Sequence, residues 1–127
     1  MADRINLSGD FRGSIVNIKS TLTNVQQSVG QIRTDDQSAR KELEKLIGQL
    51  SETLQKVPEE SQEHAEAVAE TAKALLDTAK TEKPNKVMVQ ISGEGLKQAA
   101  KNLADVMPLV VAIASQIVLT VAKLTGI

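Results

Sequence analysis

Apolar residues recur along this chain at alternating steps of three and four, and this spacing is the strongest constraint on its fold. From residue 15 to residue 33 the repeat is unbroken; its members are Ile15, Ile18, Leu22, Val25, Val29 and Ile32. Such spacing draws one apolar stripe along a helix, and the stripe needs cover from other helices. Similar stripes predict further helices over 36–57 and 59–80. Pro58 separates these two helices, and so short a connection predicts that they are antiparallel neighbours.

The most apolar part of the chain lies near its C-terminal end. No charged residue occurs from Val106 to Ala122, a run of 17 positions, which is at the lower edge of the length that spans a bilayer. A helix over 108–125 has a wide apolar face formed by Leu109, Val110, Ile113, Ile117, Val121 and Leu124. A helix this apolar lies either inside a bundle or in lipid. We expect the bundle interior, because the other helices need cover; insertion into a membrane, directly or on release from the bundle, is the alternative.

These patterns predict one all-α domain over 1–127, a four- to five-helix bundle with an apolar C-terminal helix. Phe11 is the only aromatic residue among the 127, so that the core is built from Leu, Ile, Val and Ala, which suits closely packed helices. Residues 1–14 are predicted to be a short irregular N-terminal segment, because Gly9 and Gly13 lie among serine and aspartate. Ser14 is then a suitable N-cap for a helix over 15–33.

The stretch before the last helix is ambiguous. Val87, Val89 and Ile91 alternate with polar residues and Met88, as in a short strand, but the same residues also suit the start of a helix. A fourth helix is predicted over 94–106, and Pro108 separates it from the fifth helix over 108–125.

The helix over 15–33 has an unusually neutral surface. Lys19 is its only charged residue between Ser14 and Gln31, although a solvated helix face normally carries Glu and Lys. We therefore interpret Asn24, Gln26, Gln27 and Gln31 as a candidate self-association surface. An ordinary helix of weak propensity, held only by its apolar stripe, is the equal alternative.

Charge and composition argue against nucleic acid as a partner. The formal net charge is −1, whereas phosphate binding needs a basic surface, and aromatic stacking platforms are missing. The charge is uneven: residues 1–34 carry +2, residues 35–82 carry −6 and residues 83–127 carry +3. The chain has no cysteine and no apolar leader at its N-terminus, so we expect a cytoplasmic protein.

Nothing in the sequence indicates catalysis, a cofactor or a metal. The single histidine, His64, has serine at position 61, so that the Glu-x-x-His register of a di-iron bundle is absent. The segment from Gly9 to Ser14 lacks the lysine of a phosphate-binding loop. We therefore expect no enzymatic activity, no cofactor and no metal site.

Two stretches resemble known bacterial sequences. Residues 5–22, INLSGDFRGSIVNIKSTL, and residues 97–110, KQAAKNLADVMPLV, are similar to uncharacterised small helical proteins and modules of cyanobacteria and other filamentous bacteria. Some of those modules are attached to signalling or defence proteins. The resemblance implies an adaptor role, and it brings no catalytic residues.

Together these features predict a non-enzymatic protein–protein interaction or self-assembly module. A homo-oligomer or another protein is the expected partner. A membrane-active or pore-forming effector that uses the C-terminal apolar helix is the alternative.

Overall fold

The computed structural model describes the backbone of residues 2–126 and the side chains of residues 13–126. Five α-helices follow one another in this range: α1 (Ala2–Ser28), α2 (Gln37–Leu54), α3 (Gln62–Ala79), α4 (Lys86–Lys101) and α5 (Pro108–Thr125). Two short 3-10 helices, η1 (Val29–Gln31) and η2 (Glu59–Ser61), lie in the connections, and the described backbone contains no strand. The prediction of an all-α bundle with an apolar C-terminal helix is confirmed.

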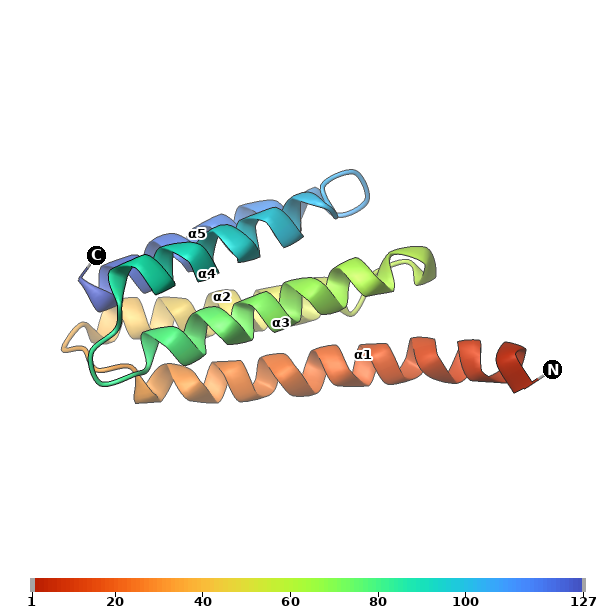
Figure 1. The fold of residues 1–127 in the computed structure, drawn as a ribbon, viewed down its shortest axis with the longest axis horizontal. Coiled ribbons are helices and arrows are strands. Elements are labelled where there is room, and N and C mark those ends of the chain that lie inside the picture. Colours follow the sequence, from red (N-terminus) through yellow and green to blue (C-terminus); the bar gives the residue numbers. More distant parts are fainter. Residues whose placement is uncertain (1, 127) are drawn as a thin grey trace.

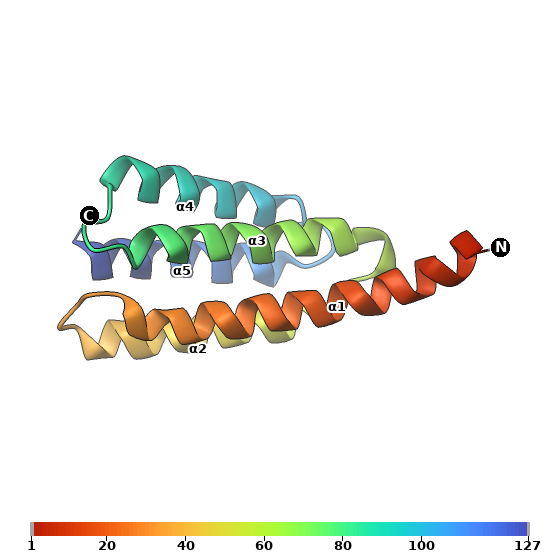
Figure 2. The same cartoon turned by 60° about the horizontal axis from the view of Figure 1, so that its bottom comes forward.

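The five helices form a closed ring. Helix α1 packs on α2 and α3, α2 packs on α5, α3 packs on α4, and the α4–α5 hairpin closes the ring. In Figure 1 this gives three layers: α1, then α2 with α3, then α4 with α5. In Figure 2, which is turned by 60°, the N-terminal end of α1 projects beyond the other helices. Consecutive helices run in opposite directions, so that α1 and α3 are parallel neighbours.

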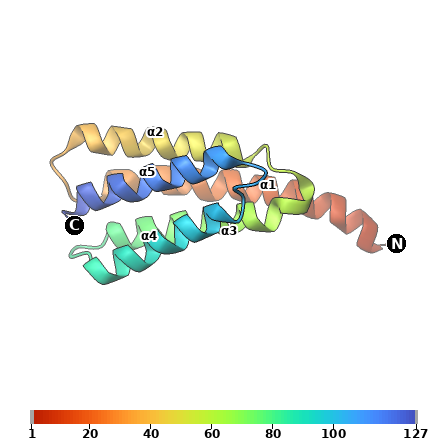
Figure 3. The ribbon, with the colours of Figure 1, turned by 90° about the horizontal axis from the view of Figure 1, so that it is seen from above.

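Helices α2 and α3 are antiparallel, as the sequence predicts, but they are not close neighbours. No extensive interface joins them. Seen from above in Figure 3, α5 lies over the space between them, and α4 lies over α3. The reason is that α1 bridges them on one side and the hairpin bridges them on the other.

Short-range signals explain where most helices begin and end. The Asp36 side chain accepts a hydrogen bond of 2.9 Å from the Ala39 backbone N–H and caps α2. The Asn85 side chain accepts from the N–H groups of Val87 and Met88 and caps α4. Helix α5 has Pro108 in its first turn and ends at Gly126, whose φ is 75°. Both residues are typical of those positions.

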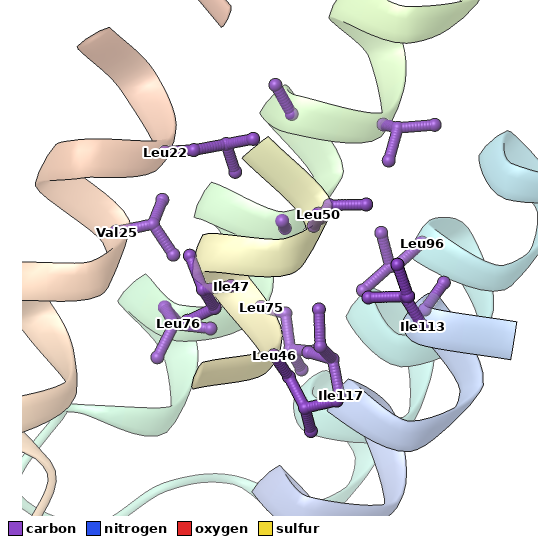
Figure 4. Packing of buried hydrophobic residues seen from close by; sticks show 14 of the residues in the cluster. Leu22, Val25, Leu46, Ile47, Leu50, Leu75, Leu76, Leu96, Ile113 and Ile117 are labelled. Atoms are coloured by element: carbon purple, nitrogen blue, oxygen red, sulfur yellow. The ribbon is translucent and has the colours of Figure 1, made fainter. Parts of the chain in front are cut away.

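The core lies inside the ring and draws on every helix. Figure 4 shows Leu22 and Val25 of α1, Leu46, Ile47 and Leu50 of α2, Leu75 and Leu76 of α3, Leu96 of α4, and Ile113 and Ile117 of α5 in one cluster. All ten side chains are buried. Each fully buried Leu or Ile contributes roughly 1.5–3 kcal/mol to folding. The heptad stripe of α1 is part of this core: Ile18, Leu22, Val25, Val29 and Ile32 are buried, and Ile15 lies at its edge.

The N-terminal segment differs from the sequence expectation. Residues 2–14 are the first part of α1 rather than an irregular segment, so that Ser14 lies inside the helix and does not cap it. Glycine and serine lower helix propensity by up to about 1 kcal/mol per residue, but only proline blocks the hydrogen bonding, and no proline precedes Pro58. Gly13 lies inside the helix and is not among the residues with a positive φ. The side chains of Ile5, Leu7 and Phe11 lie outside the described part.

The ambiguous stretch before residue 94 is helical. Helix α4 begins at Lys86 and ends at Lys101, so that the predicted bounds of 94 and 106 are both too late. A strand would place Val87, Val89 and Ile91 on one face, whereas the helix buries Val89 and exposes the other two. The cap at Asn85 supplies the start signal that the alternating pattern obscured.

Candidate interaction surfaces

Helix α1 presents most of the predicted self-association surface to solvent. Asn24, Gln27 and Gln31 are exposed. Gln26 is different, because its side-chain amide donates a 2.8 Å hydrogen bond to the backbone carbonyl of Glu44 in α2. It also fills the space above Gly48, where a Cβ would lie 3.2 Å from its Nε2 atom. Gln26 therefore belongs to the contact between α1 and α2, and not to a free surface.

A set of exposed residues on α1 and the following η1 forms a second stripe opposite the core stripe. They recur at steps of four and three, and we call Gly13, Asn17, Ser20, Asn24, Gln27 and Gln31 the neutral stripe. None carries a charge, and all are exposed. Val16, 64% exposed, lies beside the stripe. Small neutral side chains at heptad spacing let a second helix approach closely.

A shallow depression lies along the other edge of α1. Its volume is about 290 Å³, and it is open to solvent between α1 and α3. Asn17 and Thr21 line it on α1, and Glu66 and Glu70 line it on α3. The two carboxylates are one helical turn apart and make this edge of the bundle acidic.

Helix α5 is seated in the bundle by one face. Of the residues predicted to form its apolar face, Val110, Ile113, Ile117, Val121 and Leu124 are buried in the core. Leu109 is 59% exposed, because it lies at the edge of that face next to α2. This position of α5 agrees with the bundle interpretation of the sequence.

The outer face of α5 is nearly uncharged. Its exposed positions are Pro108, Leu109, Ala112, Gln116, Leu119 and Lys123, and only the last carries a charge. Within the described chain, one helix is long and apolar enough to cross a membrane by length and composition, and it is α5. Only 39% of its residues are buried inside the bundle. A solvated helix normally exposes charged residues, as α2 does with Lys41, Lys45 and Glu52.

Exposed apolar side chains concentrate in the last layer. Among the described side chains, the large hydrophobic residues that are exposed outside α1 are Val87, Met88, Ile91, Val106, Leu109 and Leu119. All of them belong to α4, α5 or the turn between them. The sequence does not reveal those on α4, because its alternating pattern obscures the helical periodicity that places Val87 and Ile91 opposite buried Leu96.

The same part of the chain has the most positive net charge. Residues 83–127 contain five lysines, Lys83, Lys86, Lys97, Lys101 and Lys123, against Glu94 and Asp105. Lys97 lies 3.8 Å from Glu94, and Lys123 lies 3.9 Å from Asp36 at the start of α2. Both contacts are long and exposed, so that they leave most of the charge available.

The described residues hold no arrangement of groups that suggests a metal centre. No three histidine, aspartate or glutamate side chains within residues 13–126 are grouped to hold an ion. His64 is exposed near the start of α3.

A second shallow depression of about 320 Å³ lies between α2 and α5, where Thr53, Lys56 and Ile113 contribute to the lining.

Comparison with known proteins finds no matching family model, no similar curated protein and no similar solved structure.

Proposed function

We propose that this protein is a non-enzymatic interaction module that self-associates through the neutral stripe of α1. The observation that carries the proposal is the heptad spacing of six exposed, uncharged residues from Gly13 to Gln31. A second copy can pack its own α1 against this stripe, because no charge has to be desolvated. Asn and Gln side chains in such a seam can bond across it and fix the register.

The length of α1 supports the same proposal. Its N-terminal end runs beyond the other helices of its own bundle (Figure 1). A short isolated helix is marginally stable in water. Packing against a second copy would cover this end as well as the stripe.

Sedimentation velocity over a wide concentration range tests the proposal. We expect a dimer that forms with rising concentration. The variant Asn24→Glu/Gln27→Glu/Gln31→Glu should shift the protein to monomer, because a symmetric interface brings the new charges together. Gln37→Glu/Ser38→Glu/Gln49→Glu is the matched control, since it adds the same charge at exposed positions of α2. A wild-type protein that stays monomeric at the highest concentration would contradict the proposal.

The proposed biological setting rests on the resemblance of residues 5–22 and 97–110 to bacterial helical modules. We propose an adaptor in bacterial signalling or defence, working in the cytoplasm and without cofactor or metal. Pull-down with the wild type and with the glutamate variant of the neutral stripe tests this role. A partner that binds the wild type but not the variant would support an adaptor role. A partner that binds both proteins would bind outside the neutral stripe.

A second candidate function is action at a membrane through α5. The exposed, almost uncharged outer face of α5 favours it. Binding to lipid vesicles tests it, and indifference to vesicles of every composition would exclude it.

A further inference from the structure

We propose that the outer face of the α4–α5 hairpin docks on an anionic lipid surface while the five-helix ring stays closed. The inference rests on the second candidate function, and it adds the surface, the class of lipid and the state of the bound protein.

The apolar part of this surface has exposed residues from both α4 and α5. Leu119 is 61% exposed on α5, and Ala112 and Gln116 are exposed on the same helix. Val87 and Ile91 are exposed on α4. Exposed Leu, Val and Ile side chains on a helix surface enter the boundary between headgroups and acyl chains.

The charge of the hairpin specifies the lipid. Lys86 and Lys101 are exposed on α4, and Lys123 is exposed on α5. Segment 83–127 carries +3, whereas segment 35–82 carries −6. Lysine stems can lie along an apolar surface while their ammonium groups reach the headgroups. Anionic lipid therefore attracts this layer, and it repels the acidic part of the molecule and so orients the bundle.

A second copy fits this surface poorly. Two hairpins face to face would bring +2 against +2, the charge of residues 86–125, which opposes association. The acidic outer face of α3, with Glu63, Glu70 and Asp77, offers the opposite charge. However, the apolar residues exposed on α3 are Ala67 and Ala74. They are too small to cover the Leu119 side chain of a second copy. A lipid surface supplies both the negative charge and the apolar phase.

The ring stays closed because the inner face of α5 is already occupied. Ile117, Val121 and Val110 are fully buried, and α5 contacts both α2 and α4. Withdrawal of α5 would expose this core to water and open the ring. Docking by the outer face needs no such change.

Flotation with lipid vesicles tests the inference on the full chain. We expect binding to vesicles of phosphatidylcholine with phosphatidylserine and little binding to phosphatidylcholine alone. Binding should weaken as salt rises, because the attraction is screened. Lys86→Gln/Lys101→Gln should weaken binding about 25-fold, at about five-fold for each lysine near the surface. Lys41→Gln/Lys45→Gln, which removes the same charge from exposed positions of α2, should have little effect.

A second pair of variants tests the apolar contact. Leu119→Gln should weaken binding about ten-fold through loss of apolar burial. Val16→Gln is the matched control, because Val16 is 64% exposed on α1, on the far side of the ring. Equal losses from both variants would overturn the assignment of the surface.

A cross-link separates docking from insertion. In Gly93→Cys/Val118→Cys a disulfide would join α4 to α5, and the oxidised protein should still bind without causing dye leakage. Leakage, or binding abolished by the cross-link, would overturn the inference and leave membrane action by insertion. No binding to anionic vesicles at low salt would remove both the inference and the second candidate function.

Discussion

Gly93 of α4 lies directly against Val118 of α5. A Cβ built on Gly93 would be 3.0 Å from Cγ1 of Val118 and 3.9 Å from its Cβ. Glycine is thus needed here for close approach of two helices, and not for an unusual backbone angle. The contact fixes the spacing of the hairpin that closes the ring.

This contact predicts that two nearby glycines respond differently to alanine. Gly95→Ala should raise the free energy of unfolding by up to about 1 kcal/mol through helix propensity, since its Cβ would make only an ordinary 3.9 Å contact with Thr71. Gly93→Ala should not stabilise the protein, because the new Cβ would press on Val118. Valine is stiff at χ1, so that Val118 cannot easily move aside. Urea unfolding of both variants measures the difference, and equal stabilisation would contradict the packing.

The same pair predicts an engineered disulfide. The 3.9 Å separation of the two Cβ atoms falls within the range of about 3.5–4.5 Å found in disulfides. Gly93→Cys/Val118→Cys should oxidise readily and stabilise the protein by roughly 2–4 kcal/mol. Thermal unfolding with and without reductant measures this, and the chain has no other cysteine to interfere. A lower Tm in the oxidised form would show that the hairpin is not packed in this way.

Truncation of a side chain should affect stability very differently on the two faces of α5. Ile117→Ala should cost about 2–5 kcal/mol, because it leaves a cavity in the core. Leu119→Ala, two residues away and 61% exposed, should change stability by about 0.5 kcal/mol or less. Denaturant midpoints of the two variants without detergent test the seating of α5. Similar losses of stability in the two variants would mean that α5 does not pack into the core through the face that carries Ile117.

The caps of α4 and α3 form a second matched comparison. Asn85→Ala should cost about 1 kcal/mol, because the Asn85 side chain accepts from two backbone N–H groups. Ser61→Ala should cost little, because Ser61 makes no side-chain bond to the start of α3. Thermal unfolding compares them, and Asn85→Asp should recover most of the loss.

Gln26 and Gln27 separate folding from association. Gln26→Ala should destabilise the monomer by about 0.5–1.5 kcal/mol, the usual net value of a hydrogen bond, through loss of its bond to the Glu44 carbonyl. Gln27→Ala should leave monomer stability unchanged, because Gln27 is exposed. Unfolding at low protein concentration checks both.

Local signals made much of the fold predictable. The helix predicted over 108–125 begins and ends at those residues in the structure, because Pro108 and Gly126 mark its two ends. The apolar stripes of α2 and α3 also predict helices that the structure contains. The start of α4 was missed because alternating Val87, Val89 and Ile91 mimic a strand. The N-terminal part of α1 is not predictable from local signals, because Gly9 and Gly13 are typical of loops although a helix accommodates them.

Long-range packing was harder to predict. Nothing local indicates that α2 and α3 are bridged by other helices, because that depends on which stripes meet in space. The same limit affected the candidate surface. Asn24, Gln27 and Gln31 are on the free face as expected, but Gln26 is held by α2. A glutamine one position along the helix faces a different neighbour, and only the placement of α2 shows it.

The closed ring has a consequence for synthesis of the chain. On the ribosome, α1, α2 and α3 emerge before α5, which packs directly on α2 and α4. The inward face of α2, with Leu50, therefore lacks the cover of α5 until translation has passed Thr125. A chain that stalls before this point exposes apolar core residues to chaperones. The eighteen residues of α5 cover these core residues once they are made.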